Sequence, residues 1–205
     1  MKDLHQEIIS TYNRLGKRYL KRISKLVPSA RVRFIKMLPK NARVLDVGCA
    51  GGRDSKAFVA KGFRVTGIDA SRVFINEAKK YVPKARFFQK DLRKLVFPAN
   101  SFDGIWAQAV LLHLKRNEVP KVLRSFYRLL KPGGVLHVEV KKGKGARYVK
   151  EALSAHQRRF FTFFTQSELE TLVRKAGFKI IYSVLTPDEL KRKNVPWVTV
   201  WGRKI

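Results

Sequence analysis

The chain has 205 residues, 45% of them hydrophobic and 29% charged, which is typical of a globular protein and long enough for one well-buried domain. The charged N-terminal segment and the lack of an apolar run near the roughly 20 residues of a membrane span lead us to expect a cytoplasmic protein without a signal peptide. The single Cys49 cannot form an internal disulfide.

The net charge is unusually positive. Lys and Arg number 45 and Asp and Glu 15, giving a net charge of +30 and a sequence isoelectric point near 10.8. Such an excess attracts polyanions, of which nucleic acid is the commonest in a cytoplasm. Because the basic residues are dispersed along the chain, a solvated basic surface explains them about as well as RNA binding does.

Residues 1–40 predict a helical cap. From Leu4 to Val27 apolar residues recur every three or four positions, and Lys and Arg fill the outer face, which indicates an amphipathic helix. A second helix is expected at Ala30–Leu38, ended by Pro39, whose ring disfavours helical backbone at the preceding residue.

Residues 41–140 predict a cofactor-binding core in which strands alternate with helices. An apolar strand at Val44–Val47 runs through a glycine-rich turn into a helix that starts near Ser55. Further strands are expected at 63–69, 86–89, 102–107 and 135–140, and further helices at 72–81, with Ser71 as N-cap, and at 114–130. This alternation implies a doubly wound α/β fold, a parallel sheet covered by helices on both faces, with ligands at the carboxyl ends of its strands.

Residues 141–205 predict the substrate side of the same single domain and its closing strands. A basic loop at 141–145 is followed by a helix expected at Ala146–Gln157 and another at Ser167–Ala176, which Gly177 ends. Late strands are expected at 179–185 and 197–201, joined by a charged loop at 186–195.

Three carboxylates mark one edge of the predicted sheet. Asp46, Asp69 and Asp91 each close one of three successive strands. An acid at the end of the second strand can accept both hydroxyls of a ribose, and the glycine turn after Asp46 lets backbone N–H groups approach a ligand. Asp46 itself would repel a pyrophosphate and favour a cationic or hydroxylated ligand. Each acid could instead cap a helix or a turn, but three in register indicate a nucleoside site.

The motifs VLDVGCAGG, GIDAS, KDL, FDGIWAQAVLLHL and LLKPGGVL occur in this order. Together they resemble the class I S-adenosylmethionine-dependent methyltransferases, particularly the small single-domain "methyltransferase domain" proteins. The resemblance implies S-adenosylmethionine as the cofactor and a Rossmann-like, mostly parallel seven-stranded sheet with an antiparallel last strand. The cofactor-binding residues that it implies are Tyr12, Asp46, Gly48, Cys49, Ala50, Gly51, Gly52, Asp69, Ala70, Ser71, Asp91, Leu92, Ala107 and Gln108.

The implied roles differ among these residues. Asp69 would hold the ribose hydroxyls, Ala70 would touch adenine, and Asp91 with Leu92 would read the adenine edge. Tyr12 would close over the cofactor from the N-terminal helix, unless it belongs to a core aromatic stripe.

Ala50 departs from the family pattern, in which the middle position of the first loop is usually glycine. Alanine disfavours left-handed backbone, so we expect the turn to keep Ala50 at negative φ. A dinucleotide-binding oxidoreductase fits less well, because the G-x-G-x-x-G spacing is missing.

Methyl transfer needs mainly alignment, and a base only where the acceptor carries a proton of high pKa. His113, just past the fourth strand, is a candidate general base, or a structural residue that caps the next helix. Tyr12 is a second candidate catalytic residue, and no metal site is predicted. The chain lacks the Asn/Asp-Pro-Pro-aromatic motif of enzymes that methylate base amines, and its only cysteine lies in the cofactor turn.

The aromatic and basic segment 158–165 is the candidate substrate wall, with Arg158, Arg159 and Phe163 as substrate-binding residues. It also resembles the matching region of wobble-uridine carboxymethyl methyltransferases. Structured RNA such as tRNA is therefore the leading acceptor hypothesis. The alternatives are a small molecule methylated on an oxygen, a carboxylate or an amine, and a non-catalytic RNA-binding protein on the same fold.

Overall fold

The computed structural model describes residues 3–151, 154–155, 157–188 and 196–205. Its centre is a seven-stranded sheet in the order β3-β2-β1-β4-β5-β9-β8. The strands are β1 (Arg43–Val47), β2 (Arg64–Asp69), β3 (Arg86–Gln89), β4 (Phe102–Gln108), β5 (Leu130–Lys141), β8 (Phe178–Thr186) and β9 (Trp197–Lys204). Only β9 runs antiparallel to its neighbours in this sheet, so the predicted doubly wound fold with an antiparallel last strand is confirmed.

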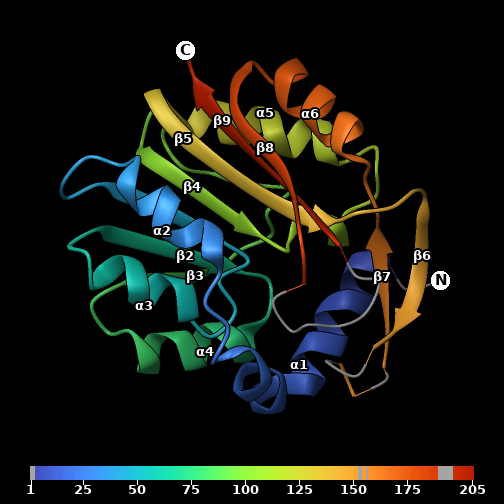
Figure 1. The fold of residues 1–205 in the computed structure, drawn as a ribbon. Helices are drawn as coiled ribbons and strands as arrows, with labels where there is room; N and C mark the ends of the chain where they lie inside the picture. The colour runs from blue at the N-terminus through green and yellow to red at the C-terminus, as the bar shows by residue number, and fades with distance from the viewer. Residues whose placement is uncertain (1–2, 152–153, 156, 189–195) are drawn as a thin grey trace.

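Helices cover both faces of the sheet, as Figure 1 shows. They are α1 (Leu4–Ile23), α2 (Ser29–Lys36), α3 (Arg53–Val59), α4 (Arg72–Tyr81), α5 (Val119–Leu129) and α6 (Gln166–Lys175), with a short 3₁₀ turn, η1, at Leu111–His113. The larger core lies under α5 and α6, and a second core lies under α2 and α3 around Phe34, Phe58 and Trp106. None of the helices among the described residues combines the length and the apolarity that crossing a membrane requires.

The helix α1 lies across the carboxyl ends of the strands rather than against a face of the sheet (Figure 1). Its buried side chains Ile8 and Leu15 belong to the predicted apolar stripe. The helix is shorter than predicted and is kinked at Gly16, which has a φ of +47°. Glycine adopts this left-handed conformation without the clash that a Cβ would cause.

The helix predicted at Ala146–Gln157 is wrong where the structure describes this segment. Ala146–Lys150 forms strand β6, which pairs antiparallel with β7 (Arg158–Thr162), while residues 152, 153 and 156 lie outside the described part. Tyr148 opposes Phe160 and lies at a ring distance of 5.6 Å from it. Cross-strand aromatic pairing of this kind overrides a weak helical pattern.

Two boundaries near the helix predicted at 114–130 also differ. The 3₁₀ turn η1 precedes α5, so the helix starts at Val119 instead of residue 114. The strand β5 begins at Leu130, directly after α5, instead of at residue 135. Both changes leave the carboxyl ends of β4 and β5 side by side, where the site is built.

Candidate functional site

The glycine-rich loop after β1 is bound to the end of β2. The backbone N–H groups of Gly48 and Cys49 both donate to the carbonyl of Ile68, at 2.8 and 3.0 Å. Gly48 has a φ of +70°, and a Cβ there would lie 2.6 Å from Cγ2 of Val110. The loop therefore has room only for glycine at its first turn.

Ala50 has a φ of +46°, so the prediction of negative φ is wrong. Its N–H donates to Oδ2 of Asp69 at 3.0 Å, while Ser71 N–H donates to Oδ1 at 2.8 Å. Left-handed backbone costs alanine about 1–2 kcal/mol, and a hydrogen bond to a carboxylate contributes about as much. The charged acceptor thus offsets the strain, and it holds both oxygens of Asp69 at the cavity wall.

Asp46 lies beneath this loop and is almost completely buried. The Ser55 hydroxyl donates to its Oδ2 at 2.6 Å. Burial, reinforced by the nearby Asp54 carboxylate, raises the pKa of Asp46 to about 7, and burial raises the pKa of Asp69 to about 6. A cationic ligand in the cavity would therefore favour the ionised form of both groups.

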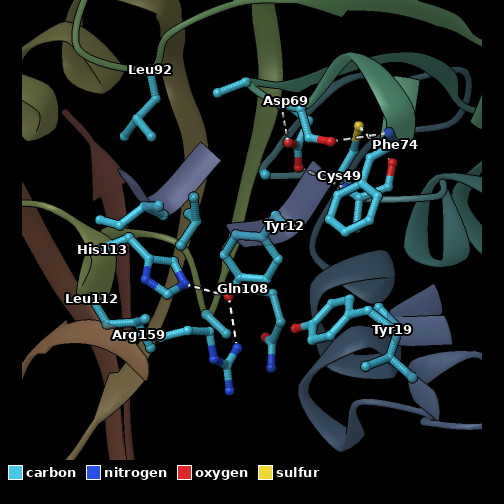
Figure 2. Close-up of a pocket in the computed structure, with 18 of the residues that line it drawn as sticks. Tyr12, Tyr19, Cys49, Asp69, Phe74, Leu92, Gln108, Leu112, His113 and Arg159 are labelled. Carbon is cyan, nitrogen blue, oxygen red and sulfur yellow. Dashed lines mark hydrogen bonds between the residues drawn. The ribbon is translucent and has the colours of Figure 1, made fainter. Parts of the chain in front are cut away.

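Three side chains from distant parts of the chain form one hydrogen-bonded unit, which Figure 2 shows beside Gln108. The Tyr12 hydroxyl lies 2.7 Å from Nε2 of His113, and Nη1 of Arg159 donates to the Tyr12 oxygen at 2.8 Å. Nδ1 of His113 lies 3.2 Å from the carbonyl of Phe160, which can only accept a hydrogen bond. Nδ1 therefore carries the proton, and Nε2 accepts the proton of Tyr12.

This unit makes His113 a weak base. Burial, reinforced by the positive charge of Arg159, lowers the pKa of His113 to about 3, and burial raises the pKa of Tyr12. A proton on His113 would add a second buried cation beside Arg159 and break the bond from Tyr12. The general-base role of His113 stays a prediction, and the geometry gives the ring a clearer task, which is to hold Tyr12.

A polar row crosses the sheet at the same edge. Gln108, Glu139 and Thr199 are direct neighbours on β4, β5 and β9. The Gln108 amide donates to Oε1 of Glu139, and the Thr199 hydroxyl donates to Oε2 at 2.9 Å. Two residues further along β5, Lys141 forms an ion pair with Glu151, which also pairs with Arg159 at 2.5 Å.

A cavity of about 190 Å³ joins these groups, and its lining includes many of the predicted site residues. The predicted residues in its wall are Tyr12, Asp46, Gly48, Cys49, Ala50, Asp69, Ala70, Ser71, Leu92, Gln108, His113 and Arg159. Those that the structure places outside the lining are Gly51, Gly52, Asp91, Ala107, Arg158 and Phe163. The predicted cofactor and substrate roles of individual residues stay predictions.

Three of the residues outside the wall have other contacts. The carboxylate of Asp91 accepts hydrogen bonds from the Arg93 guanidinium at 2.8 to 3.1 Å, and its Oδ2 lies 3.3 Å from Nε2 of His5. Arg158 stacks on Tyr148 at 4.2 Å, and Phe163 packs beneath Arg147 at 3.9 Å. Of the three predicted substrate-binding residues, only Arg159 lines the cavity, and Phe161 of the same segment lines it as well.

Sequence reasoning missed several polar residues of the cavity, among them Glu139, Lys141 and Glu151. The alternation Val138-Glu139-Val140-Lys141 at the end of an apolar strand was a usable signal, because period-two polarity places both charges on one face.

The donor set fits a nucleoside that carries a positive charge. Asp69 offers a carboxylate at the end of β2 where a ribose diol binds in dinucleotide folds, and the loop residues Gly48, Cys49 and Ala50 line the cavity beside it. Among the described residues, six Asp and Glu residues line the cavity, against four Lys and Arg residues. The described lining of this cavity is thus richer in acidic than in basic side chains, in contrast to the sequence as a whole.

Comparisons with known proteins identify the family of this chain. The family described as "Methyltransferase domain" matches residues 17–183. YqeM of Bacillus subtilis is 32% identical over 140 residues, which cover 63% of this chain and little more than half, 55%, of YqeM. The ubiquinone biosynthesis O-methyltransferase of Coxiella burnetii is 28% identical over 171 residues, covering 76% of this chain and 72% of that protein. The Burkholderia thailandensis 1,6-didemethyltoxoflavin-N1-methyltransferase, solved with 1,6-didemethyltoxoflavin and S-adenosylhomocysteine, has a TM-score of 0.76 and 23% identity, covering 100% of this chain and 91% of that one.

Proposed function

Because this chain belongs to the methyltransferase domain family of S-adenosylmethionine-dependent enzymes, we propose that it methylates a small molecule held between the strand ends and α1. The observation that carries the proposal is that the lining of one cavity includes both Asp69 and the Tyr12–His113–Arg159 unit. One part of this cavity suits a nucleoside and the other part suits an acceptor.

The residues around the glycine loop would hold the cofactor. Asp69 would accept the ribose hydroxyls, the backbone from Gly48 to Ala50 would lie along the methionine part, and Leu92 would pack on the base. When bound, S-adenosylmethionine supplies a methyl group on a positively charged sulfur, which is electrophilic without further activation. The main task of the protein is therefore to align the acceptor with that methyl group.

Tyr12, His113 and Arg159 would shape the acceptor part of the cavity. Arg159 and His113 fix the orientation of the Tyr12 hydroxyl, and α1 carries this hydroxyl across the carboxyl ends of the strands. We propose that this unit encloses the acceptor and excludes water, a role that needs no proton transfer to His113.

A small acceptor is favoured over RNA for two reasons. Arg158 and Phe163, on which the RNA hypothesis relied, lie outside the cavity, and Arg159 is committed to Tyr12 and Glu151. The relative named as a ubiquinone biosynthesis O-methyltransferase also gives no support to an RNA acceptor. The basic surface supports RNA only through its charge.

Binding of S-adenosylhomocysteine, measured by calorimetry, tests the cofactor assignment. We expect Asp69→Ala to weaken binding by at least about tenfold, the effect of losing one charge-assisted hydrogen bond. Asp103→Ala is the matched control, because Asp103 also belongs to a strand of the sheet but binds Lys131 at 2.7 Å outside the cavity lining. Undiminished binding by Asp69→Ala, or no binding by the wild type, would sink the assignment.

The acceptor class needs a separate experiment. The protein is incubated with labelled S-adenosylmethionine and, in parallel, with total RNA and with a metabolite extract. We expect label in small molecules and none in RNA. Label that enters RNA in the wild type and is lost in Tyr12→Phe would replace the small-molecule proposal by the RNA one.

A further inference from the structure

Two exposed valines lie where α1 leads into α2. Val27 is 64% exposed and Val32 is 55% exposed. Val27 precedes Pro28, the N-cap of α2, and Val32 is the fourth residue of that helix. Side chains at these two positions are neighbours at a helix start. The valines therefore form one apolar patch, and more than half of the surface of each faces water.

The chain around this patch carries only positive charge. Residues 8–45 contain eleven Lys and Arg residues and no Asp or Glu. Two acids from elsewhere pair with them among the described residues, since Asp54 binds the half-buried Arg31 at 2.9 Å and Glu77 lies 3.6 Å from Lys17. The exposed basic residues of this stretch are Arg14, Lys17, Arg18, Lys21, Arg22, Lys25, Arg33, Lys36, Lys40 and Arg43.

The apolar patch and several of these charges share the outer side of α2. Phe34 anchors this helix, because its ring is fully buried and lies 5.2 Å from the ring of Trp106. Val32 and Lys36 are two positions before and after Phe34, which at about 100° per residue places both on the side of α2 that faces away from the sheet. The helices α5 and α6 cover the opposite face of the sheet (Figure 1).

This combination suits the surface of an anionic bilayer better than it suits RNA. A basic surface attracts the phosphates of either one, but surfaces that bind single-stranded RNA add aromatic rings on which bases stack. The aromatic residues of 8–45 point elsewhere, since Tyr12 and Tyr19 line the cavity and Phe34 is buried. Exposed aliphatic side chains among basic residues are instead typical of a surface that lies in the headgroup layer of a membrane.

We propose that the outer side of residues 17–36 is a docking surface for an anionic lipid bilayer. Val27 and Val32 enter the boundary between headgroups and acyl chains, and the surrounding Lys and Arg residues bind lipid phosphates. The surface adjoins the cavity, because Ile23 and Leu26 belong to the cavity lining. The inference goes beyond the proposed function and does not depend on it, since none of these contacts involves a cofactor or an acceptor.

Co-sedimentation with lipid vesicles tests the docking surface. The vesicles consist of phosphatidylcholine alone, or of phosphatidylcholine with about one third of phosphatidylglycerol, in about 0.15 M salt. We expect the wild type to bind the anionic vesicles at least about tenfold more tightly than the neutral ones. A net charge of +30 produces part of such a preference wherever the charges lie, so two pairs of variants locate the surface.

The first pair moves the loss of charge from one face to the other. Lys25→Gln/Lys36→Gln should weaken binding to the anionic vesicles at least about tenfold, because each Lys near a membrane surface contributes about fivefold. Lys121→Gln/Lys175→Gln is the matched control, since it removes two exposed lysines from α5 and α6 and gives the same net charge. The control should lose less than about threefold, because these charges lie far from the bilayer and are screened.

The second test leaves the charge unchanged. Val27→Ser/Val32→Ser removes the apolar patch and should weaken binding to the anionic vesicles about tenfold. Binding of a single-stranded RNA should be the same in this variant and in the wild type. Full vesicle binding by the valine variant, or equal losses in the two lysine variants, would overturn the proposal. If, in addition, RNA binding is lost only in Lys25→Gln/Lys36→Gln, the surface is one for RNA.

Binding of S-adenosylhomocysteine keeps this test separate from the proposed function. None of the substituted residues lines the cavity, so all three variants should bind this ligand as the wild type does. If the wild type binds the vesicles as expected but not S-adenosylhomocysteine, the proposed function falls and the docking surface stands. If it binds S-adenosylhomocysteine but shows no preference for anionic vesicles, the docking surface falls and the proposed function stands.

Discussion

The close approach of the first loop to Val110 predicts a large cost for Gly48→Ala. The substitution adds a Cβ only 2.6 Å from Cγ2 and 2.8 Å from Cβ of Val110, at a φ of +70°. Left-handed backbone costs alanine about 1–2 kcal/mol, and overpacking a buried site typically costs about 1–3 kcal/mol. We therefore expect the free energy of unfolding to fall by about 2–5 kcal/mol, less a few tenths that alanine recovers by restricting the unfolded chain.

Gly133→Ala is the control for the backbone part of this cost. Gly133 has a φ of +78°, but a Cβ there would have nothing within 4 Å. Urea unfolding, followed by far-UV circular dichroism, should show that Gly48→Ala loses about 1–3 kcal/mol more than Gly133→Ala, the overpacking part alone. The double variant Gly48→Ala/Val110→Ala should recover part of that difference. Equal losses for the two single variants would refute the argument from close approach.

Three further predictions concern the groups around the cavity. Ala50→Gly should raise the free energy of unfolding by up to about 1 kcal/mol, because glycine adopts a φ of +46° without the steric cost that alanine has. A lower free energy of unfolding in urea would contradict this. Stability should fall as pH rises from about 4 to about 7, since Asp46 keeps its proton to about pH 7 when folded but loses it near its ordinary pKa of 3.8 when unfolded. In Asp46→Asn the free energy of unfolding, measured in urea, should fall less steeply with pH. An unchanged pH dependence would show that other groups cause it. Arg159→Met should cost about 2–4 kcal/mol and speed amide hydrogen exchange in α1, because it removes buried bonds to Tyr12 and Glu151. Exposed Arg158→Met should cost less than about 1 kcal/mol and leave that exchange unchanged.

The order of strands and helices could be predicted because each strand of the core carries its own signal. Apolar runs of four to seven residues that contain Asp46 or end in Asp69 predict buried parallel strands, and the boundaries of β3 and α4 agree with the prediction. The β6–β7 hairpin could not be predicted in the same way. Its strand β6 is mostly exposed and takes its conformation from pairing with β7, so the local sequence holds little of the information.

The part of the site that we propose to hold the cofactor was more predictable than the part that we propose to hold the acceptor. Asp69 and the glycine loop lie within one strand–turn–helix unit, whose geometry follows from the local sequence. The left-handed φ of Ala50 depends on a hydrogen bond to Asp69, and the direction of Asp91 depends on Arg93. Neither partner can be chosen from spacing alone. The neighbours of Glu139 come from β4 and β9, so they are defined only when the sheet is complete.

Thr199 lies on β9, the last strand of the sheet to be synthesised. The strand β9 lies between β5 and β8, although β8 precedes it in the chain. On a ribosome, the loop at Gly48 and the carboxylate of Asp69 emerge long before Thr199, and β8 waits for β9 before it can join the sheet. A partly synthesised chain can thus form the part of the cavity around Gly48 and Asp69 before the Thr199 hydroxyl reaches Glu139. The same order means that a one-residue slip of β9 would turn Thr199 to the opposite face of the sheet and leave the first half of the cavity unchanged.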